Sequence, residues 1–167
     1  MPEDQTIRDL ATQVVHDLSA SGKAVSTAES CTGGWIAKAL TDVPGSSSCF
    51  AYGIVSYSNG AKESMLGVQN QTLADNGAVS EPVVREMAEG ALQLSGADIA
   101  IAVSGVAGPE GGTEEKPVGT VWFAWSVRGP KGIKTDTDLQ RFDGSRDSVR
   151  TQTVLHGLQG VHGRTSK

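Results

Sequence analysis

The chain has 167 residues, and its 14 lysines and arginines against 19 acidic residues give a formal net charge of −5. Hydrophobic residues make up 38% and charged residues 20%, which is typical of a soluble globular protein with its core in one domain. The acidic balance argues against binding of nucleic acid through an overall positive field, so we expect no nucleic-acid partner.

Local sequence excludes further classes. The longest apolar runs, such as residues 99–103, fall far short of the ~20 residues that a membrane span needs. Residues 1–5 are acidic and polar, unlike a signal or transit peptide. Cys31 and Cys49 make no disulfide framework, and the three histidines lack the spacing of zinc ligands. We therefore expect a cytoplasmic protein with no membrane partner, no metal and no cofactor.

The first half of the chain predicts helices that alternate with strands. Residues 7–18 are the clearest helix, because their apolar side chains recur at the spacing of one helical face. A short buried strand is predicted at residues 24–27, and a second helix from about residue 32 to residue 40. Residues 50–57 predict another strand, which a helical turn at residues 62–66 follows.

The second half continues this alternation and then adds a hairpin. Ser80 is expected to cap a helix with Pro82 in its first turn. The continuous apolar run at residues 99–103 predicts a central strand that is covered on both faces. Residues 118–127 and 133–142 alternate in polarity around a turn and predict an antiparallel hairpin.

A last helix is predicted from about Ser145 to Leu158, and the polar tail from Gly160 is expected to be frayed. The order of these elements predicts an α/β fold, a three-layer α/β/α sandwich around a mixed, mostly parallel sheet with one antiparallel hairpin. Since no linker interrupts the pattern, we expect residues 1–167 to form a single domain.

The first polar cluster, residues 27–34, lies between a predicted strand and a predicted helix. Ligands in open α/β sheets bind beyond the carboxyl ends of strands, and a helix start offers free N–H groups for an anion or an oxyanion. The alternative is structural: Ser30 or Thr32 caps the helix, and Cys31 is a small buried residue.

The second cluster, residues 56–62, ends the next strand. If Lys62 packs beside Ser30, desolvation lowers its pKa, and the amine can accept the proton of the serine hydroxyl. Tyr57 could relay a proton or orient the lysine. The alternative is that Lys62 is a solvated surface charge and that Tyr57 only covers the rim of the core.

The third cluster, residues 104–113, is rich in glycine, of which the chain has 21. Its N–H groups could converge on a phosphate or a carboxylate, although it matches neither the P-loop nor the dinucleotide fingerprint. The alternative is a crossover loop whose glycines only permit its turns.

The fourth cluster, residues 143–150, opens the last helix. Arg146 and Arg150 share one helix face and suit a phosphate clamp. The alternative is that they pair with Asp143 and Asp147 at the surface.

Taken together and in this order, the motifs resemble the CinA C-terminal domain family, whose stand-alone members are nicotinamide-nucleotide amidases. The resemblance spans about residues 5–160. It is carried by Ala28–Gly34, Tyr57–Lys62, Gly77–Glu81, Ser104–Gly112 and Lys116–Val121. One departure is Gly60, where many members carry Glu.

The resemblance implies hydrolysis of the amide of nicotinamide mononucleotide to nicotinate mononucleotide and ammonia, in pyridine nucleotide recycling. It implies that Ser30 is the nucleophile and Lys62 its base, with Tyr57 beside them. The oxyanion would be held by N–H groups of Thr32, Gly33 and Gly34. The ribose phosphate would be bound by the Gly-rich loop and one arginine, at Ser104, Gly105, Ala107, Gly108 and Arg146.

Two alternatives stay open beside this reading. One is a hydrolase that uses Cys31, although none of the three histidines lies in a cluster at a strand end. The other is a module that binds a nucleotide without chemistry. In either case we expect a small-molecule ligand and a homodimer.

Overall fold

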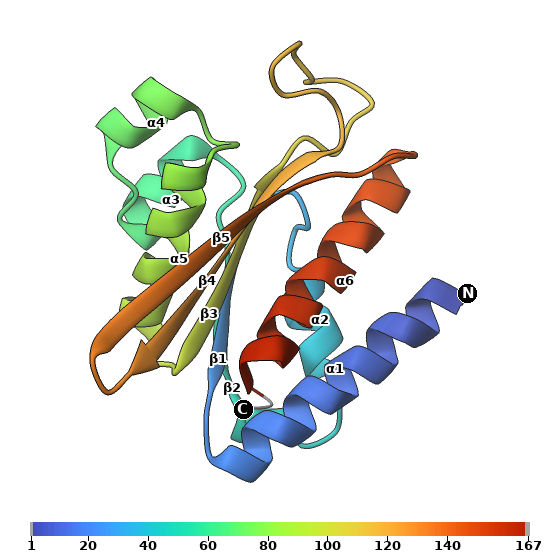
Figure 1. Cartoon of the computed structure of the whole chain (residues 1–167), viewed down its shortest axis with the longest axis vertical. Helices are drawn as coiled ribbons and strands as arrows, with labels where there is room; N and C mark the ends of the chain where they lie inside the picture. The colour runs from blue at the N-terminus through green and yellow to red at the C-terminus, as the bar shows by residue number, and fades with distance from the viewer. Residues whose placement is uncertain (1, 166–167) are drawn as a thin grey trace.

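One mixed sheet with the strand order β2-β1-β3-β4-β5 organises residues 2–165, the part of the chain that the computed structural model describes (Figure 1). Strands β2, β1 and β3 pair in parallel, whereas β3, β4 and β5 pair antiparallel. Their bounds are β1 Val25–Glu29, β2 Phe50–Val55, β3 Ile99–Gly105, β4 Thr120–Gly129 and β5 Gly132–Arg141. The predicted hairpin is β4–β5.

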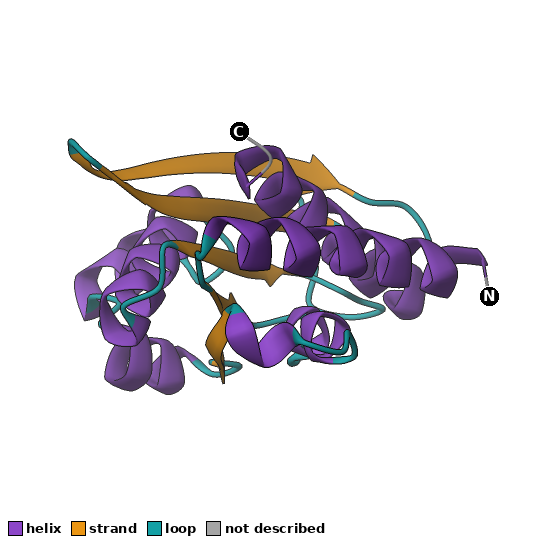
Figure 2. Ribbon diagram, turned by 90° about the horizontal axis from the view of Figure 1, so that it is seen from below, coloured by secondary structure: helices purple, strands orange, loops and turns teal. Residues whose placement is uncertain are grey.

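Helices cover both faces of this sheet (Figures 1 and 2). Helices α1, α2 and α6 pack on one face, and α5, with α3 and α4 beside it, packs on the other. Their bounds are α1 Pro2–Ser21, α2 Trp35–Thr41, α3 Asn59–Leu66, α4 Asn70–Asn76, α5 Glu81–Ser95 and α6 Arg146–Thr165. The predicted three-layer α/β/α class is therefore confirmed.

Strand β3 divides the core in two, because successive side chains of a strand point to opposite faces. Ile101 and Val103 join the core under α1, α2 and α6, whereas Ala100 and Ala102 join the core under α5. All four side chains are fully buried. The continuous apolar run thus forms the doubly covered central strand that the sequence predicts.

The parallel direction of β1, β2 and β3 brings their carboxyl ends to one edge of the sheet. Glu29, Val55 and Gly105 end these strands. The polar segments that follow each strand therefore begin side by side, although they lie far apart in the chain.

Several boundaries differ from the predictions. The second helix begins only at Trp35, and α4 and the 3-10 turn Ser46–Ser48 were not predicted. The tail from Gly160 is not frayed, since α6 continues to Thr165. Buried Val161 anchors this end of α6, and the Arg164 guanidinium lies 4.5 Å from the centre of a Trp125 ring. Residues 166–167 lie outside the described part of the chain.

The structure confirms the predicted N-cap position of Ser80 but not the expected hydrogen bond from its side chain to a helix N–H. Ser80 occupies the N-cap position of α5, but its hydroxyl donates to the Gly77 carbonyl 2.7 Å away and accepts no helix N–H. A different helix, α3, does have a side-chain cap. The Ser58 side chain accepts the Ala61 N–H at 3.1 Å at the start of that helix. This cap fixes the helix whose first turn carries Lys62.

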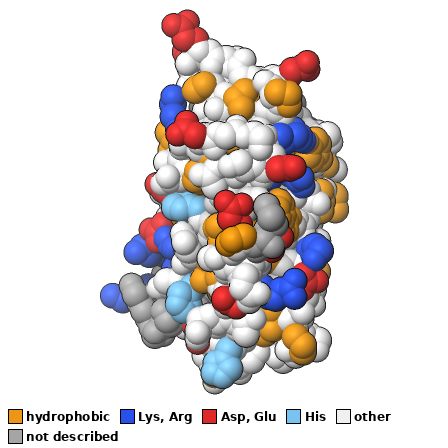
Figure 3. Space-filling model, turned by 90° about the vertical axis from the view of Figure 1, so that its right-hand side faces the viewer, with side chains coloured by type: hydrophobic (Ala, Val, Ile, Leu, Met, Phe, Trp, Pro, Cys, Tyr) orange, Lys and Arg blue, Asp and Glu red, His pale blue; other side chains and the backbone are white. Residues whose placement is uncertain are grey.

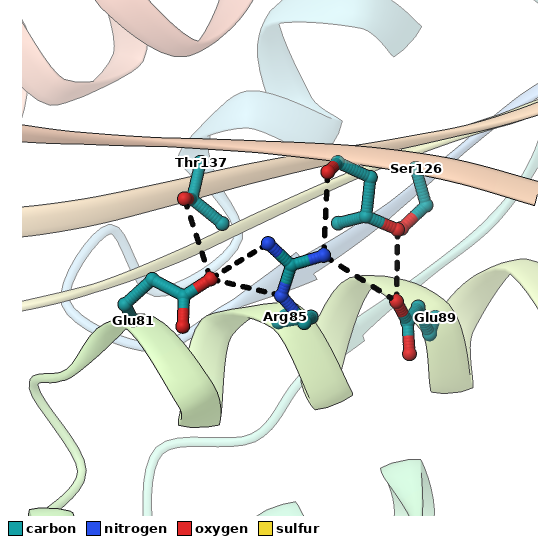
Figure 4. Close-up of polar contacts among 6 residues, drawn as sticks. Glu81, Arg85, Glu89, Ser126 and Thr137 are labelled. Atoms are coloured by element: carbon teal, nitrogen blue, oxygen red, sulfur yellow. Dashed lines mark hydrogen bonds and ion pairs between the residues drawn. The ribbon is translucent and has the colours of Figure 1, made fainter.

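A network of polar side chains ties α5 to the hairpin (Figure 4). Arg85 contacts Glu81 at 2.8 Å and donates to the Thr135 carbonyl at 3.3 Å. The Thr135 hydroxyl donates to Glu89 at 2.9 Å and shares a hydrogen bond of 2.8 Å with Ser126. The β4–β5 hairpin is thus joined to α5 by polar contacts as well as by the apolar core.

The surface over α1 and α6 mixes acidic, basic and histidine side chains with scattered apolar ones (Figure 3). In residues 2–165 no helix combines the length and the apolar character needed to cross a membrane.

Helix α5 approaches α3 so closely that only glycine fits at the contact. A Cβ on Gly90 would lie 1.9 Å from the Leu66 carbonyl oxygen, which is backbone and cannot rotate away. The contact lies at the last residue of α3, the helix that carries Lys62.

We predict that Gly90→Ala lowers the free energy of unfolding by about 1–3 kcal/mol through overpacking, although alanine is the better helix former. Gly163→Ala in α6 is the matched control, because a Cβ there meets nothing within 4 Å. The control should gain up to about 1 kcal/mol. Urea denaturation measures the free energy of unfolding of both variants. An increase in both would contradict the close contact between Gly90 and Leu66.

Candidate active site

Ser30 and Lys62, which are 32 residues apart in sequence, meet at the carboxyl edge of the sheet. Ser30 directly follows β1, and Lys62 lies in α3 after β2. The Lys62 Nζ lies 3.0 Å from the Ser30 Oγ and is hydrogen-bonded to it. Lys62 is only 1% exposed and Ser30 8%, so the lysine is not a solvated surface charge.

The buried amine of Lys62 contacts one hydroxyl oxygen and two backbone carbonyl oxygens. Its Nζ also donates to the carbonyls of Ser56 at 2.9 Å and Tyr57 at 3.2 Å. No ion pair among the described residues includes Lys62. Burial lowers the pKa of Lys62 below its ordinary value, opposed by a smaller contribution from the nearby Cys31. The buried amine of Lys62 therefore loses its proton more readily than a free lysine does.

Cys31 borders the same site but is held as a thiol. Burial, with a further contribution from the charge of Glu29, raises the pKa of Cys31 to about 12. Histidines, which could activate it, pair elsewhere: His156 lies 2.7 Å from Asp138, and His162 lies 3.2 Å from Asp17. The environment of Cys31 disfavours the alternative in which this residue is the nucleophile.

A cavity of about 290 Å³ opens over Ser30 and Lys62. Eight predicted site residues line it, namely Ser30, Tyr57, Lys62, Ser104, Gly105, Ala107, Gly108 and Arg146. They come from the ends of all three parallel strands and from the first turn of α6. The topology thus brings together segments that the sequence could only propose one by one.

Arg146 joins two walls of this cavity. Its guanidinium donates to the Gly108 carbonyl at 2.8 Å and to the Tyr57 hydroxyl at 3.1 Å. Tyr57 is 58% exposed, and it is the Tyr57 carbonyl, not the hydroxyl, that contacts Lys62. No ion pair joins Arg146 to Asp143 or Asp147 within the described part of the chain. The guanidinium is therefore available at the mouth of the cavity.

Thr32, Gly33 and Gly34 do not line the cavity of Ser30. They line a separate cavity of about 600 Å³ between α1, α2 and α6. The Gly33 N–H donates to the Ser30 carbonyl at 3.0 Å, and the Gly34 N–H faces the carboxylate of Glu29. The expectation that the two glycines offer free donors to a ligand is therefore wrong, because internal acceptors occupy these donors.

Glu29 is the residue that sequence reasoning missed. Its buried carboxylate accepts the Thr32 hydroxyl at 2.5 Å and the N–H groups of Ile36 and Ala37 at 2.8 and 3.1 Å. Burial raises the pKa of Glu29, while these hydrogen bonds oppose the rise. A glutamate at the end of a strand, just before a helix start, was the available signal. Glu29 anchors the turn that follows Ser30 through Thr32 and Gly34. We call this turn, residues 31–34, the catalytic turn because of the role proposed below for Ser30.

These features define an α/β protein with a ligand cavity at the carboxyl ends of parallel strands. The profile of the CinA C-terminal domain matches residues 7–164. The Escherichia coli K12 protein named nicotinamide-nucleotide amidohydrolase PncC is 54% identical over 156 residues, 93% of each chain. A Pseudomonas putida protein of the same name is 50% identical over 155 residues, 93% of this chain and 94% of the other.

Solved structures agree with this match. The crystal structure of a competence-damaged protein (CinA) superfamily protein from Klebsiella pneumoniae has a TM-score of 0.90 and 43% identity, over 96% of this chain and 98% of that one. The chain belongs to the CinA C-terminal domain family.

Proposed function

We propose that this protein hydrolyses the carboxamide of nicotinamide mononucleotide to nicotinate mononucleotide and ammonia, a step of pyridine nucleotide recycling. The observation that carries the proposal is the 3.0 Å contact between Ser30 and the buried amine of Lys62. The names of the relatives from E. coli and P. putida support the substrate.

In the mechanism that we propose, Lys62 acts as the general base. A neutral amine has two N–H groups and one lone pair, and the carbonyls of Ser56 and Tyr57 can accept the two N–H groups. The lone pair is then left for Ser30, whose hydroxyl donates to it. The two carbonyls thus orient the base as well as satisfying it.

The Ser30 Oγ attacks the carboxamide carbon while its proton passes to the Lys62 Nζ. The resulting tetrahedral intermediate collapses as the Lys62 ammonium returns that proton to the leaving nitrogen, so that ammonia departs and an ester to Ser30 remains. Water then attacks the ester with Lys62 again as base, which releases the carboxylate and restores the serine.

The oxyanion needs donors other than Gly33 and Gly34, whose N–H groups are occupied. We assign this role to peptide N–H groups that border the cavity, with Cys31 foremost because it adjoins the nucleophile. Thr32 acts indirectly, since its hydroxyl holds Glu29.

We assign the phosphate of the substrate to Arg146 and to the loop that contains Ser104, Gly105, Ala107 and Gly108. In a chain with a net charge of −5, a dianion needs a concentrated group of donors. Tyr57 lines the site, and its hydroxyl holds the Arg146 guanidinium by accepting a hydrogen bond.

A homodimer and a cytoplasmic location remain predictions. Light scattering in solution tests the first of them, and cell fractionation tests the second.

Release of ammonia from nicotinamide mononucleotide tests the function. Ser30→Ala should lower kcat by at least about 10³-fold, because Lys62 contacts the Ser30 hydroxyl and the neighbouring Cys31 is held as a thiol. Cys31→Ala is the matched control and should keep most of the activity. An inactive Cys31 variant beside an active Ser30 variant would reverse the assignment, and no ammonia from the unaltered protein would refute it.

The pH dependence follows from the lowered pKa of Lys62. The amine is a base only when neutral, so kcat/KM should rise with pH and level off above a pKa lower than the ~10.4 of a free lysine. Lys62→Arg should be inactive, because a guanidinium does not lose its proton near neutrality. An active arginine variant would leave the proposed base without a role.

Arg146→Ala should lower kcat/KM for nicotinamide mononucleotide by about 10- to 100-fold, the size of one charge-assisted hydrogen bond. The same variant should hardly affect nicotinamide riboside, which lacks the phosphate. Equal losses on both substrates would show that Arg146 supports the chemistry or the fold instead.

A further inference from the structure

Arg150 reaches the catalytic turn from the side opposite to the cavity of Ser30. Its Nε donates to the Cys31 carbonyl at 3.1 Å and its Nη2 to the Thr32 carbonyl at 3.0 Å. Both carbonyls belong to the two residues that directly follow Ser30, although Arg150 lies more than a hundred positions further along the chain. One side chain of α6 therefore holds two successive peptides of the turn.

The guanidinium of Arg150 is fixed by its surroundings. It lies 5.6 Å from the centre of a Trp35 ring, a cation–π distance. A Cβ on Gly33 would lie 3.6 Å from its Nη2, so the turn packs against it. Within residues 2–165 Arg150 forms no ion pair. Its N–H groups donate to the carbonyls of Cys31 and Thr32 instead. Because the guanidinium is planar and donates to the carbonyls of two successive peptides, it restricts the rotation of both peptides.

We propose that Arg150 is a positioning residue for the nucleophile. By fixing the carbonyls of Cys31 and Thr32, it fixes the backbone that sets the direction of the Ser30 side chain and of the Cys31 N–H. This inference rests on the proposed role of Ser30 in the reaction. It separates the two arginines of α6: Arg146 faces the substrate cavity, whereas Arg150 holds the catalytic turn from behind.

Loss of Arg150 should affect the rate more than substrate binding. A displacement of about 1 Å at the reacting atoms can cost on the order of 100-fold in rate. The contacts of Lys62 with Ser56 and Tyr57, and those of Arg146 with Gly108, do not involve Arg150. The pH profile and KM should therefore stay close to those of the unaltered protein while kcat falls.

The cavity behind the turn makes a direct test possible. Arg150, Trp35 and Gly33 are among the residues that line its volume of about 600 Å³. A small guanidinium ion can enter such a space and occupy the place of a deleted arginine head group. Methylguanidinium at concentrations too low to unfold the protein is the probe.

The experiment compares Arg150→Ala with Arg128→Ala as a matched control. Arg128 also donates to two carbonyls, those of Ala97 and Leu92, but at the opposite end of the sheet. Arg150→Ala should lower kcat about 10- to 100-fold with little change in KM, and methylguanidinium should restore part of the loss. Arg128→Ala should keep its kcat and should not respond to the probe.

A second readout does not depend on the substrate. A fluorophosphonate reagent labels an activated serine, and mass spectrometry measures how fast Ser30 is modified. Labelling should slow in Arg150→Ala by a factor similar to the loss in kcat. Arg150→Lys, which keeps the charge and loses the fork, should fold normally and still label slowly.

Normal labelling and normal kcat in a variant whose unfolding midpoint has fallen would overturn the inference and leave Arg150 a purely structural role. If the unaltered protein releases no ammonia but its Ser30 is labelled, and labelling slows without Arg150, the proposed substrate fails while the positioning role stands.

Discussion

A primary amine buried at the carboxyl edge of the sheet is the constraint on which the site depends. Among residues 2–165 no carboxylate forms an ion pair with Lys62, and burial lowers the pKa of its amine. Its N–H groups still need acceptors, and the carbonyls of Ser56 and Tyr57 supply them at the end of β2. The cap at Ser58 and the close contact at Gly90 then hold α3 where this arrangement can form.

The rest of the site follows from the direction of three parallel strands. Strand β1 delivers Ser30, β2 delivers the carbonyls around Lys62, and β3 delivers the loop from Ser104. Helix α6 closes the site with Arg146, which lines the cavity of Ser30, and with Arg150, which holds the catalytic turn and lines the other cavity. Glu29 holds that turn from within the protein. The turn beside Ser30, the nucleophile that we propose, is thus held by contacts from several elements.

The sequence predicted β3 from its continuous apolar run, which is buried throughout, and the β4–β5 hairpin from two segments that flank a turn. It failed where tertiary contacts decide: Val161 packs in the core and keeps α6 helical beyond Gly160. Single clusters suggested Ser30 and Lys62, but only the strand order places them in contact. The role of Gly33 and Gly34 could not be predicted, because the buried carboxylate of Glu29 competes for the same N–H groups and no pattern of spacing reveals that competition.

The central claim is that the amine of Lys62 is neutral under the conditions in which the protein acts. Titration of the lysine side chains by ¹³C NMR, with the Lys62 signal assigned by its loss in Lys62→Arg, measures this pKa directly and needs no substrate. The account predicts that the Lys62 signal titrates below the ~10.4 of the free side chain. A Lys62 signal that titrates at or above that value would contradict the account, because an ammonium cannot accept the proton of Ser30.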